Sequence, residues 1–329
     1  MTFEFQKGLL DLGGGAHVFL SGSEAFGLAN AGLVVGNGES MVIDTLYDVQ
    51  HAQEMMDAIG ASTANSPVRY IVNTHSDGDH IFGNQVFPDD AEIVVTEAAS
   101  TQMTQEHADL TASLFDESRR PESVLHPVAA LTQEFDIHPV RVRPADTTFC
   151  GEKEITVGGV EVQLHELGPA HTVGDAIAYL PAQKVLFAGD LLTRDIVKVT
   201  WSGSIPNWIT ALERIRAFGA EIVVAGHGPV LAGAAITAAI DLATEFWSYI
   251  HEQAMAFYDR GVPADEAAAR IDVTKYPLAN VTLPVLVTAV YHECNPDIPY
   301  RDLTQAFESM AEQVAKMMTP SDENSRTHG

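Results

Sequence analysis

Short apolar runs, separated by glycine-containing turns and amphipathic stretches, alternate along most of the chain. Residues 48–59 follow the helical period, which places Ala52, Met55, Met56 and Ile59 on one face of a predicted helix. The apolar runs of this first half that predict β-strands are residues 31–35, 40–44, 68–72 and 91–95. Strands that alternate with helices predict an α/β fold.

The second half of the chain repeats this arrangement. A Gly158-Gly159 turn joins two runs that predict a β-hairpin, and residues 206–218 predict a helix. The predicted strands of this half are residues 154–157, 160–164, 176–180, 184–188 and 221–225. From about residue 234 to residue 318 the pattern becomes mostly helical. We therefore expect a catalytic domain over residues 1–233 and a mainly helical extension over residues 234–329 that packs on it.

Residues 97–145 are less regular than the rest of the first domain. They combine a polar, helix-like stretch with Pro121, Pro127 and Pro139. Long irregular segments inside a domain are commonly functional loops, so we interpret residues 97–145 as a lid-like insertion that shapes a substrate pocket.

Residues with metal-binding side chains follow several predicted strands. The run Thr-His-Ser-Asp-Gly-Asp-His at residues 74–80 comes directly after one strand, and His171, Asp190 and His227 follow others. The side chains of the first run cannot all face one way on a strand, but they can converge from a tight loop that Gly78 relaxes. Imidazole and carboxylate ligands together suit zinc, iron, manganese or nickel.

The order and local context of these residues resemble the metallo-β-lactamase-fold hydrolases, whose signature is HxHxDH followed by H, D and H. The resemblance covers roughly residues 15–232 and implies an αββα sandwich, here with the C-terminal helical extension. It also implies a site for two divalent metal ions, whose bridging hydroxide would be the nucleophile. The implied ligands are His75, Asp77 and His171 for the first ion, Asp79, His80 and His227 for the second, and Asp190 as the bridge.

Asp77 departs from the family signature, because the family has a histidine at this position. If Asp77 is a ligand, three carboxylates and one hydroxide together neutralise the charge of two divalent ions. Such a site favours harder ions such as iron or manganese, in addition to the zinc that the family resemblance implies. Alternatively, the shorter side chain leaves the first site weak or empty. In a third interpretation Asp77 is a base, or it orients His75 or a metal-bound water. Asp79 is expected to orient the nucleophile while it binds metal.

Three functions fit this site. The first is metal-dependent hydrolysis of a small ester, lactone, thioester or amide. The second is an iron-dependent oxidoreductase, resembling the sulfur dioxygenases of the same fold, because two histidines and one carboxylate can hold non-haem iron. The third is a non-catalytic protein with a vestigial site. In the first two functions the partner is a small-molecule substrate.

Charge and composition narrow the choice of partners. The net charge is −27, from 45 acidic and 18 basic residues, and such a field repels nucleic acid. The chain has no apolar run of membrane-spanning length, so we expect no membrane partner. Two distant cysteines and the absence of a secretion signal predict a cytoplasmic protein. The oligomeric state stays open.

Two further expectations concern residues near the predicted site. Asp44 is expected to support the metal-binding loop by hydrogen bonding without binding metal itself. Trp201, Trp208 and Phe187 lie close to Asp190 in the sequence, and their pattern fits either packing in the core or lining a pocket.

Overall fold

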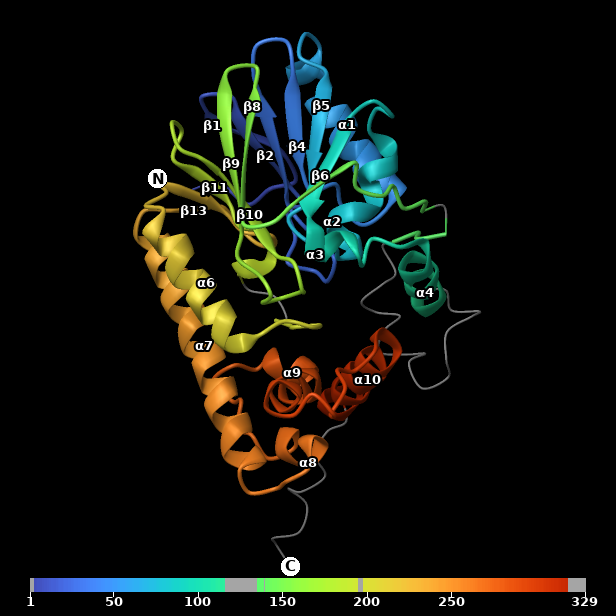
Figure 1. The fold of residues 1–329 in the computed structure, drawn as a ribbon, viewed down its shortest axis with the longest axis vertical. Coiled ribbons are helices and arrows are strands. Elements are labelled where there is room, and N and C mark those ends of the chain that lie inside the picture. The colour runs from blue at the N-terminus through green and yellow to red at the C-terminus, as the bar shows by residue number, and fades with distance from the viewer. Residues whose placement is uncertain (1–2, 116–134, 139, 195–197, 319–329) are drawn as a thin grey trace, which may run out of the picture.

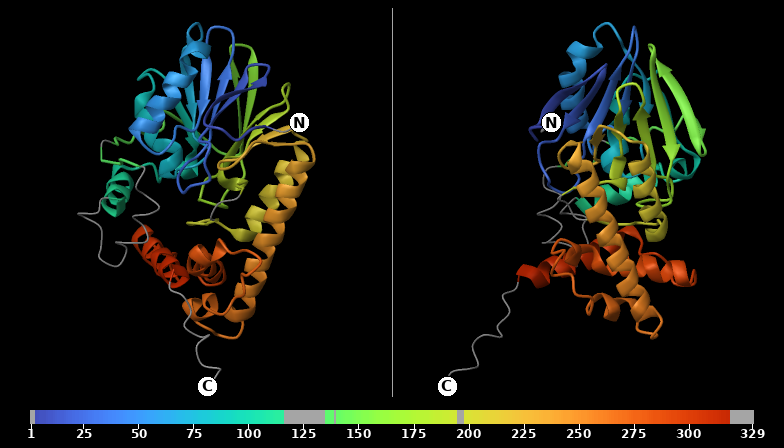
Figure 2. Two further views of the ribbon diagram at one scale, coloured as in Figure 1. Left: turned by 180° about the vertical axis from the view of Figure 1, so that it is seen from behind. Right: turned by 90° about the vertical axis from the view of Figure 1, so that its left-hand side faces the viewer.

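The computed structural model describes residues 3–115, 135–138, 140–194 and 198–318, and two β-sheets pack face to face between helices (Figure 1, Figure 2). Apolar side chains from both inner faces fill the space between the sheets, among them Met41 and Val72 from the first sheet and Leu164 and Val185 from the second. The chain therefore has the layered αββα sandwich that its signature implied.

The first sheet contains seven strands in chain order. They are β1 (Gly8–Gly13), β2 (Ala16–Leu20), β3 (Ala31–Val35), β4 (Ser40–Ile43), β5 (Val68–Val72), β6 (Glu92–Thr96) and β7 (Thr147–Phe149). Neighbouring strands from β1 to β4 are antiparallel, whereas β4, β5, β6 and β7 pair in parallel. Because parallel strands end at the same edge, the loops that follow β4 and β5 meet there.

The second sheet has the strand order β13-β12-β11-β10-β9-β8. Its strands are β8 (Glu152–Val157), β9 (Val160–Glu166), β10 (Ala176–Leu180), β11 (Val185–Phe187), β12 (Ile222–Val224) and β13 (Leu231–Ala232). Strands β11 and β12 pair in parallel, so the loops after them also share one edge. The 3₁₀ helix η3 (Gly189–Leu191) follows β11 at that edge.

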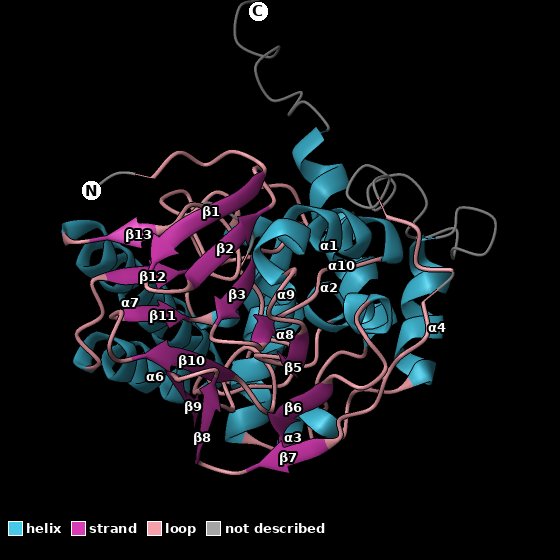
Figure 3. Cartoon of the chain, turned by 90° about the horizontal axis from the view of Figure 1, so that it is seen from above, coloured by secondary structure: helices cyan, strands magenta, loops and turns pink. Residues whose placement is uncertain are grey.

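Helices cover the outer face of each sheet. Helix α1 (Val49–Thr63) buries Met55 and Ile59 against the first sheet, and the Asp48 side chain caps its first turn. Helices α6 (Ile205–Ala217) and α7 (Ala234–Tyr258) cover the second sheet (Figure 3), where Trp208 and Trp247 join the core beneath them. Short helices at the strand ends are α2 (Gly78–Ile81), η1 (Phe82–Val86) and α3 (Glu97–Ser100).

The remaining helices lie beyond the ends of the strands (Figure 1). They are α4 (Gln105–Phe115), α8 (Ala264–Ala268), α9 (Ala279–Cys294) and α10 (Leu303–Met318). Phe307 and Ala311 of α10 pack with Leu114 of α4, so the helical extension contacts the segment interpreted as a lid. None of the helices in the described ranges combines the length and hydropathy that crossing a bilayer requires.

The predicted elements and the observed ones agree closely. Every predicted strand coincides with an observed one to within two residues at either end. The predicted helix over residues 48–59 extends further, to Thr63, and that over residues 206–218 forms one residue earlier. The sequence patterns missed strands β1 and β2 and the short strands β7 and β13. Of the segment 97–145, residues 116–134 and 139 lie outside the described residues.

Candidate metal centre

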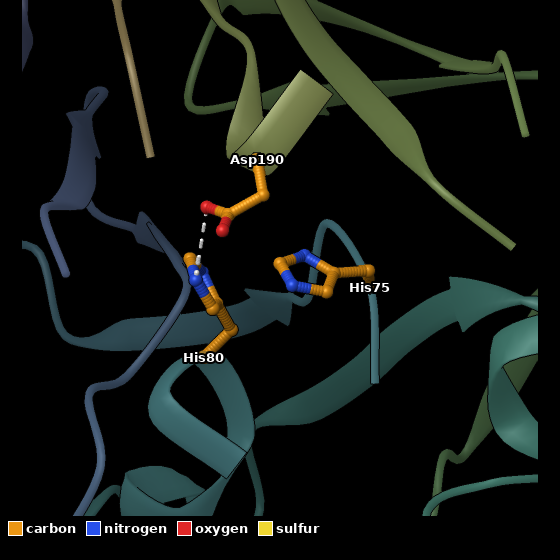
Figure 4. A group of neighbouring side chains, drawn as sticks. All are labelled: His75, His80 and Asp190. Atoms are coloured by element: carbon orange, nitrogen blue, oxygen red, sulfur yellow. Dashed lines mark ion pairs between the residues drawn. The ribbon is translucent and has the colours of Figure 1, made fainter. Parts of the chain in front are cut away.

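Four loops at the strand ends bring the predicted site residues together. Residues 73–80 follow β5, Asp190 follows β11 and His227 follows β12, while His171 lies in the loop between β9 and β10. Figure 4 shows His75, His80 and Asp190 directed toward one another, the two histidines from the segment after β5 and Asp190 from the turn after β11. All seven residues that the sequence indicated therefore meet at one place, although they span about 150 positions of the sequence.

The seven side chains form two groups that Asp190 joins. In one, the Nε2 atom of His171 lies 2.9 Å from Asp77 Oδ2, and that of His75 lies 3.9 Å from the same oxygen. In the other, Asp79 Oδ2 lies 3.2 Å from His227 Nε2 and 3.7 Å from His80 Nε2.

Asp190 reaches both groups. Its Oδ1 atom lies 3.3 Å from His80 Nε2, and its Oδ2 atom lies 3.4 Å from His227 Nε2 and 3.7 Å from His171 Nε2. A single carboxylate thus faces imidazoles of both groups, which is the arrangement that a bridging ligand needs.

The imidazole nitrogens that face inward and those that face outward have different surroundings. Each outward Nδ1 atom has a partner. His75 Nδ1 lies 3.0 Å from Thr74 Oγ1, and His80 Nδ1 lies 2.9 Å from Asp44 Oδ2. His171 Nδ1 lies 2.8 Å from Val199 O, and His227 Nδ1 lies 3.2 Å from Leu28 O. Such outer partners hold the proton on Nδ1 and leave the Nε2 lone pair directed into the centre.

The inward-facing atoms include buried polar groups that make no hydrogen bond. Among the described residues, His75 Nε2, His80 Nε2 and Asp190 Oδ1 are buried and make no hydrogen bond. Buried polar atoms are normally satisfied, so a cluster of orphaned imidazole nitrogens and a carboxylate oxygen fits a place for cations. The donor set of imidazoles and carboxylates suits divalent metals.

The electrostatics of the metal-free centre agree with this fit. Burial lowers the pKa of His171, but the Asp77 carboxylate outweighs it and raises that pKa to about 10. Burial likewise lowers the pKa of His227, and Asp190 and Asp79 raise it to about 9. Without metal, these imidazolium ions compensate the buried carboxylates, so a cation that enters must displace their protons.

Two glycines show how tightly the backbone fits here. A Cβ atom on Gly226 would lie 2.0 Å from Asp190 Oδ1, so only glycine can precede His227. The interpretation of Gly78 as a residue that relaxes the loop was wrong. Gly78 begins the helical turn α2, and an added Cβ atom would lie 2.5 and 2.7 Å from the rings of Phe82 and Tyr47. Its small size therefore matters for close packing.

Asp44 supports the site as the sequence suggested. The side chain is buried, its Oδ1 atom accepts the Thr74 N–H at 2.8 Å, and its Oδ2 atom accepts the Thr74 hydroxyl at 2.8 Å. The same Oδ2 atom contacts His80 Nδ1. Asp44 thus holds His80 directly and the loop of His75 through Thr74, and it belongs to none of the clusters of described residues that could hold a metal.

A pocket of about 470 Å³ opens onto the centre. Asp77, Asp79, Asp190, His171 and His227 contribute to its floor. Its walls combine polar side chains, such as Gln102, His107, Arg301 and Asp302, with aromatic and aliphatic ones that include Phe26, Tyr47, Leu110, Trp201, Leu303 and Phe307.

The structure separates the three aromatic residues near Asp190. Trp201 lines the pocket, whereas Trp208 and Phe187 are buried in the core. The contribution of α10, through Leu303 and Phe307, was not predicted, because only the docking of the helical extension brings these residues to the pocket.

Comparison with known sequences identifies related proteins. The model of the metallo-beta-lactamase superfamily matches residues 25–227. A linear primary-alkylsulfatase from a Pseudomonas strain is 23% identical over 266 residues, which cover 70% of this chain and 47% of that protein. The alpha subunit of 2,4-dinitroanisole O-demethylase from a Nocardioides strain is 25% identical over 201 residues, covering 59% and 51%. The chain thus spans about half the length of these curated relatives.

Solved structures show the same fold. The stereoselective inverting sec-alkylsulfatase Pisa1 from Pseudomonas has a TM-score of 0.67 at 16% identity, over 88% of this chain and 51% of that one. A metallo-beta-lactamase family protein from Thermus thermophilus has a TM-score of 0.57 at 19% identity, over 87% and 95%. The first match extends over most of the chain, so it includes part of the helical extension as well as the sandwich.

Proposed function

The chain belongs to the metallo-beta-lactamase superfamily, whose model covers well over half of its residues, and we propose that it is a metal-dependent hydrolase of a small ester, lactone, thioester or amide. The observation that carries this proposal is the meeting of two histidine–carboxylate groups around Asp190 in the lining of a pocket with several aromatic and aliphatic side chains.

The proposed metal ligands fall into the same two groups. His75, Asp77 and His171 would hold one ion, Asp79, His80 and His227 would hold the other, and Asp190 would bind both. Two divalent ions at such a site supply a water of lowered pKa as nucleophile and an electrophile for the carbonyl oxygen. We propose zinc as the native metal, with iron or manganese compatible because Asp77 adds a hard anionic ligand.

Within this site the protein's own groups have distinct tasks. Asp79 borders the pocket and is partly exposed, so its carboxylate can accept a hydrogen bond from the attacking water and orient it. The contacts of the four Nδ1 atoms keep the imidazoles in place. Asp77 reaches the same space as His75 and His171, which supports its role as a ligand over the alternative that its side chain is too short.

The pocket walls indicate the chemical character of the substrate. Arg301 is the single Lys or Arg among the described residues that line the pocket, and its guanidinium contacts Pro284 O, Thr288 Oγ1 and Asp265. The group beside the scissile bond is therefore proposed to be an uncharged alkyl or aryl group. This agrees with the names of two relatives, an alkylsulfatase and an O-demethylase of 2,4-dinitroanisole, so alkyl sulfates belong among the substrates to test.

The lid interpretation is also part of the proposal. Described residues of the segment 97–145, including Thr101, Gln102, His107 and Leu110, line the pocket. We propose that these described residues shape the entrance to the metal centre, and that the domain boundary lies near residue 233.

Metal analysis of untagged protein, together with turnover of a substrate panel, tests the function. We expect two ions per chain and chelator-sensitive hydrolysis of aryl and alkyl esters, lactones, thioesters or alkyl sulfates. His171→Ala should lose metal, whereas His107→Ala, which removes a pocket histidine outside the proposed ligand set, should keep the metal content of the wild type. A wild-type chain that takes up no stoichiometric metal would contradict the proposal and favour the vestigial site.

A second function is favoured by one observation. Each group, His75 with Asp77 and His171, and Asp79 with His80 and His227, consists of two histidines and one carboxylate, the set that holds iron in non-haem oxygenases. Protein loaded with iron under anaerobic conditions and then exposed to oxygen and a thiol separates the two functions. Oxygen uptake linked to turnover would favour the oxidoreductase, whereas hydrolysis without oxygen favours the hydrolase.

A further inference from the structure

Trp201 connects Asp77 to the C-terminal helix α10. Its indole Nε1–H donates to Asp77 Oδ2 at 2.5 Å, and its backbone N–H donates to the carbonyl oxygen of His171 at 2.9 Å. We propose that Trp201 is a positioning residue that fixes the Asp77 carboxylate for metal binding, and that Phe307 of α10 holds the indole in place. This inference rests on the proposed two-metal site.

The first argument is that Asp77 otherwise lacks the support that the imidazoles have. Each of the four histidines has an outer partner for its Nδ1 atom. Asp77 occupies the N-cap position of α2, but its side chain makes no capping hydrogen bond to that helix. The carboxylate is therefore not fixed by its own element, and the indole N–H is the donor that holds its Oδ2 atom in place.

The second argument concerns which contact survives when metal binds. Asp77 Oδ2 also contacts His171 Nε2 at 2.9 Å, but a metal ion would take that nitrogen as a ligand. The Trp201 N–H then stays as a donor to the carboxylate. Trp201 would therefore be the group that keeps the Asp77 carboxylate directed at the first metal position once its bond to His171 is lost.

The third argument is that side chains of the helical extension pack against the indole ring. The rings of Trp201 and Phe307 are stacked, with centroids 6.4 Å apart and an angle of 12° between their planes. Phe307 is 2% exposed and contacts the rings of Phe26 and Phe115 edge-on. Thr282 of α9 donates its hydroxyl to Lys198 O at 2.7 Å, which ties the start of the Trp201 loop to the same extension.

The geometry therefore gives the extension a task beyond lining the pocket. Its packing on Trp201 fixes the direction of one N–H group, and that N–H group fixes one metal ligand. Loosening α10 should consequently weaken the first metal position selectively and leave the second, formed by Asp79, His80 and His227, unaffected.

Trp201→Phe tests this inference, because it keeps an aromatic ring for the stack and deletes the N–H. Zinc binding to metal-free protein is measured by competition with a chromogenic chelator, which resolves the two affinities without an activity assay. We expect the zinc association constant of the first position to fall about 10- to 100-fold, as for other partners that hold metal ligands in place, with the constant of the second position unchanged. Tyr300→Phe removes another hydrogen-bond donor from the same pocket, a hydroxyl that donates to Gly203 O, and should keep the zinc constants of both positions.

A double-mutant cycle shows whether Trp201 acts through Asp77. In an Asp77→His background, Trp201→Phe should cause no further loss of affinity, because an imidazole ligand no longer depends on that N–H. Phe307→Leu, which keeps the site apolar but removes the stack, should weaken the first position in the same direction and to a smaller extent. Thermal unfolding of the metal-free variants checks that each one folds.

Two results would overturn the inference. One is a folded Trp201→Phe variant whose two zinc-binding constants equal those of the wild type. The other is an equal loss of zinc affinity when Trp201→Phe is made in the Asp77→His background. Failure of the proposed function is a different outcome, because the wild-type chain itself would then take up no stoichiometric metal.

Discussion

Replacement of Asp44 by asparagine gives a sharp test of how the centre is held. Asp44 Oδ1 accepts the Thr74 N–H, while Oδ2 accepts the Thr74 hydroxyl and contacts His80 Nδ1, all between 2.8 and 2.9 Å. Asparagine has one acceptor and one donor group. Because the backbone N–H of Thr74 needs an acceptor, the new NH₂ group must face the hydroxyl and the imidazole.

The consequence for His80 is a change of tautomer. Its Nδ1 atom would have to accept from the asparagine, so the proton would move to Nε2, which points into the centre. The Thr74 hydroxyl would turn toward His75 Nδ1, which it contacts at 3.0 Å, and impose the same change there. Neither Nε2 atom could then offer a lone pair, so we expect metal affinity to fall about 10- to 100-fold. Replacing two hydrogen bonds to a buried carboxylate should also destabilise the fold by about 2–4 kcal/mol.

The assay combines chelator-competition titration of zinc with thermal unfolding of the metal-free and loaded forms. Asp48→Asn is a matched control, because Asp48 is equally buried and its Oδ1 atom contacts His51 Nδ1 at 2.7 Å, but it caps α1 and belongs to none of the metal clusters found among the described residues. The Asp48→Asn variant should unfold at a lower temperature than the wild type and keep the zinc-binding constants of both positions. A folded Asp44→Asn variant that binds zinc like the wild type would refute the reasoning from tautomers.

The same centre supports three further predictions. Asp190→Ala should abolish turnover and lower the content of both ions, because this carboxylate faces both groups; full metal and full activity would show that it is no bridge. Asp77→His should tighten zinc at the first position and lower the apparent pKa of the activity, since a neutral ligand leaves one more positive charge beside the bridging water. An unchanged metal content and pH profile would place Asp77 outside the ligand set. Metal affinity should rise with pH up to about 9–10 and then level off, because His171 and His227, with pKa values of about 10 and about 9, must lose protons before they bind; a constant affinity between pH 6 and 9 would contradict this.

The sequence alone was enough for the α/β pattern and for the identity of the clustered residues. Apolar runs and helical periods depend on neighbours within a few positions, so the strands from β3 to β6 and from β8 to β12 can be predicted from local pattern. Strand β1 was missed because its residues are partly or fully exposed, and the mostly buried strand β2 was missed because it is short and follows the glycines of their turn. The histidines and aspartates stood out through their order and spacing, which are also local properties.

Only the tertiary structure decided what surrounds that cluster. Asp77 and Trp201 are 124 positions apart, and their hydrogen bond exists because the fold brings the loop before α6 to the N-cap residue of α2. Leu303 and Phe307 carry no mark in the sequence that distinguishes them from other apolar residues of an amphipathic helix. They reach the pocket because α10 packs on α4 and Trp201. Contacts of this kind depend on how distant surfaces fit together, and the local periods from which strands and helices are predicted contain no information about that fit.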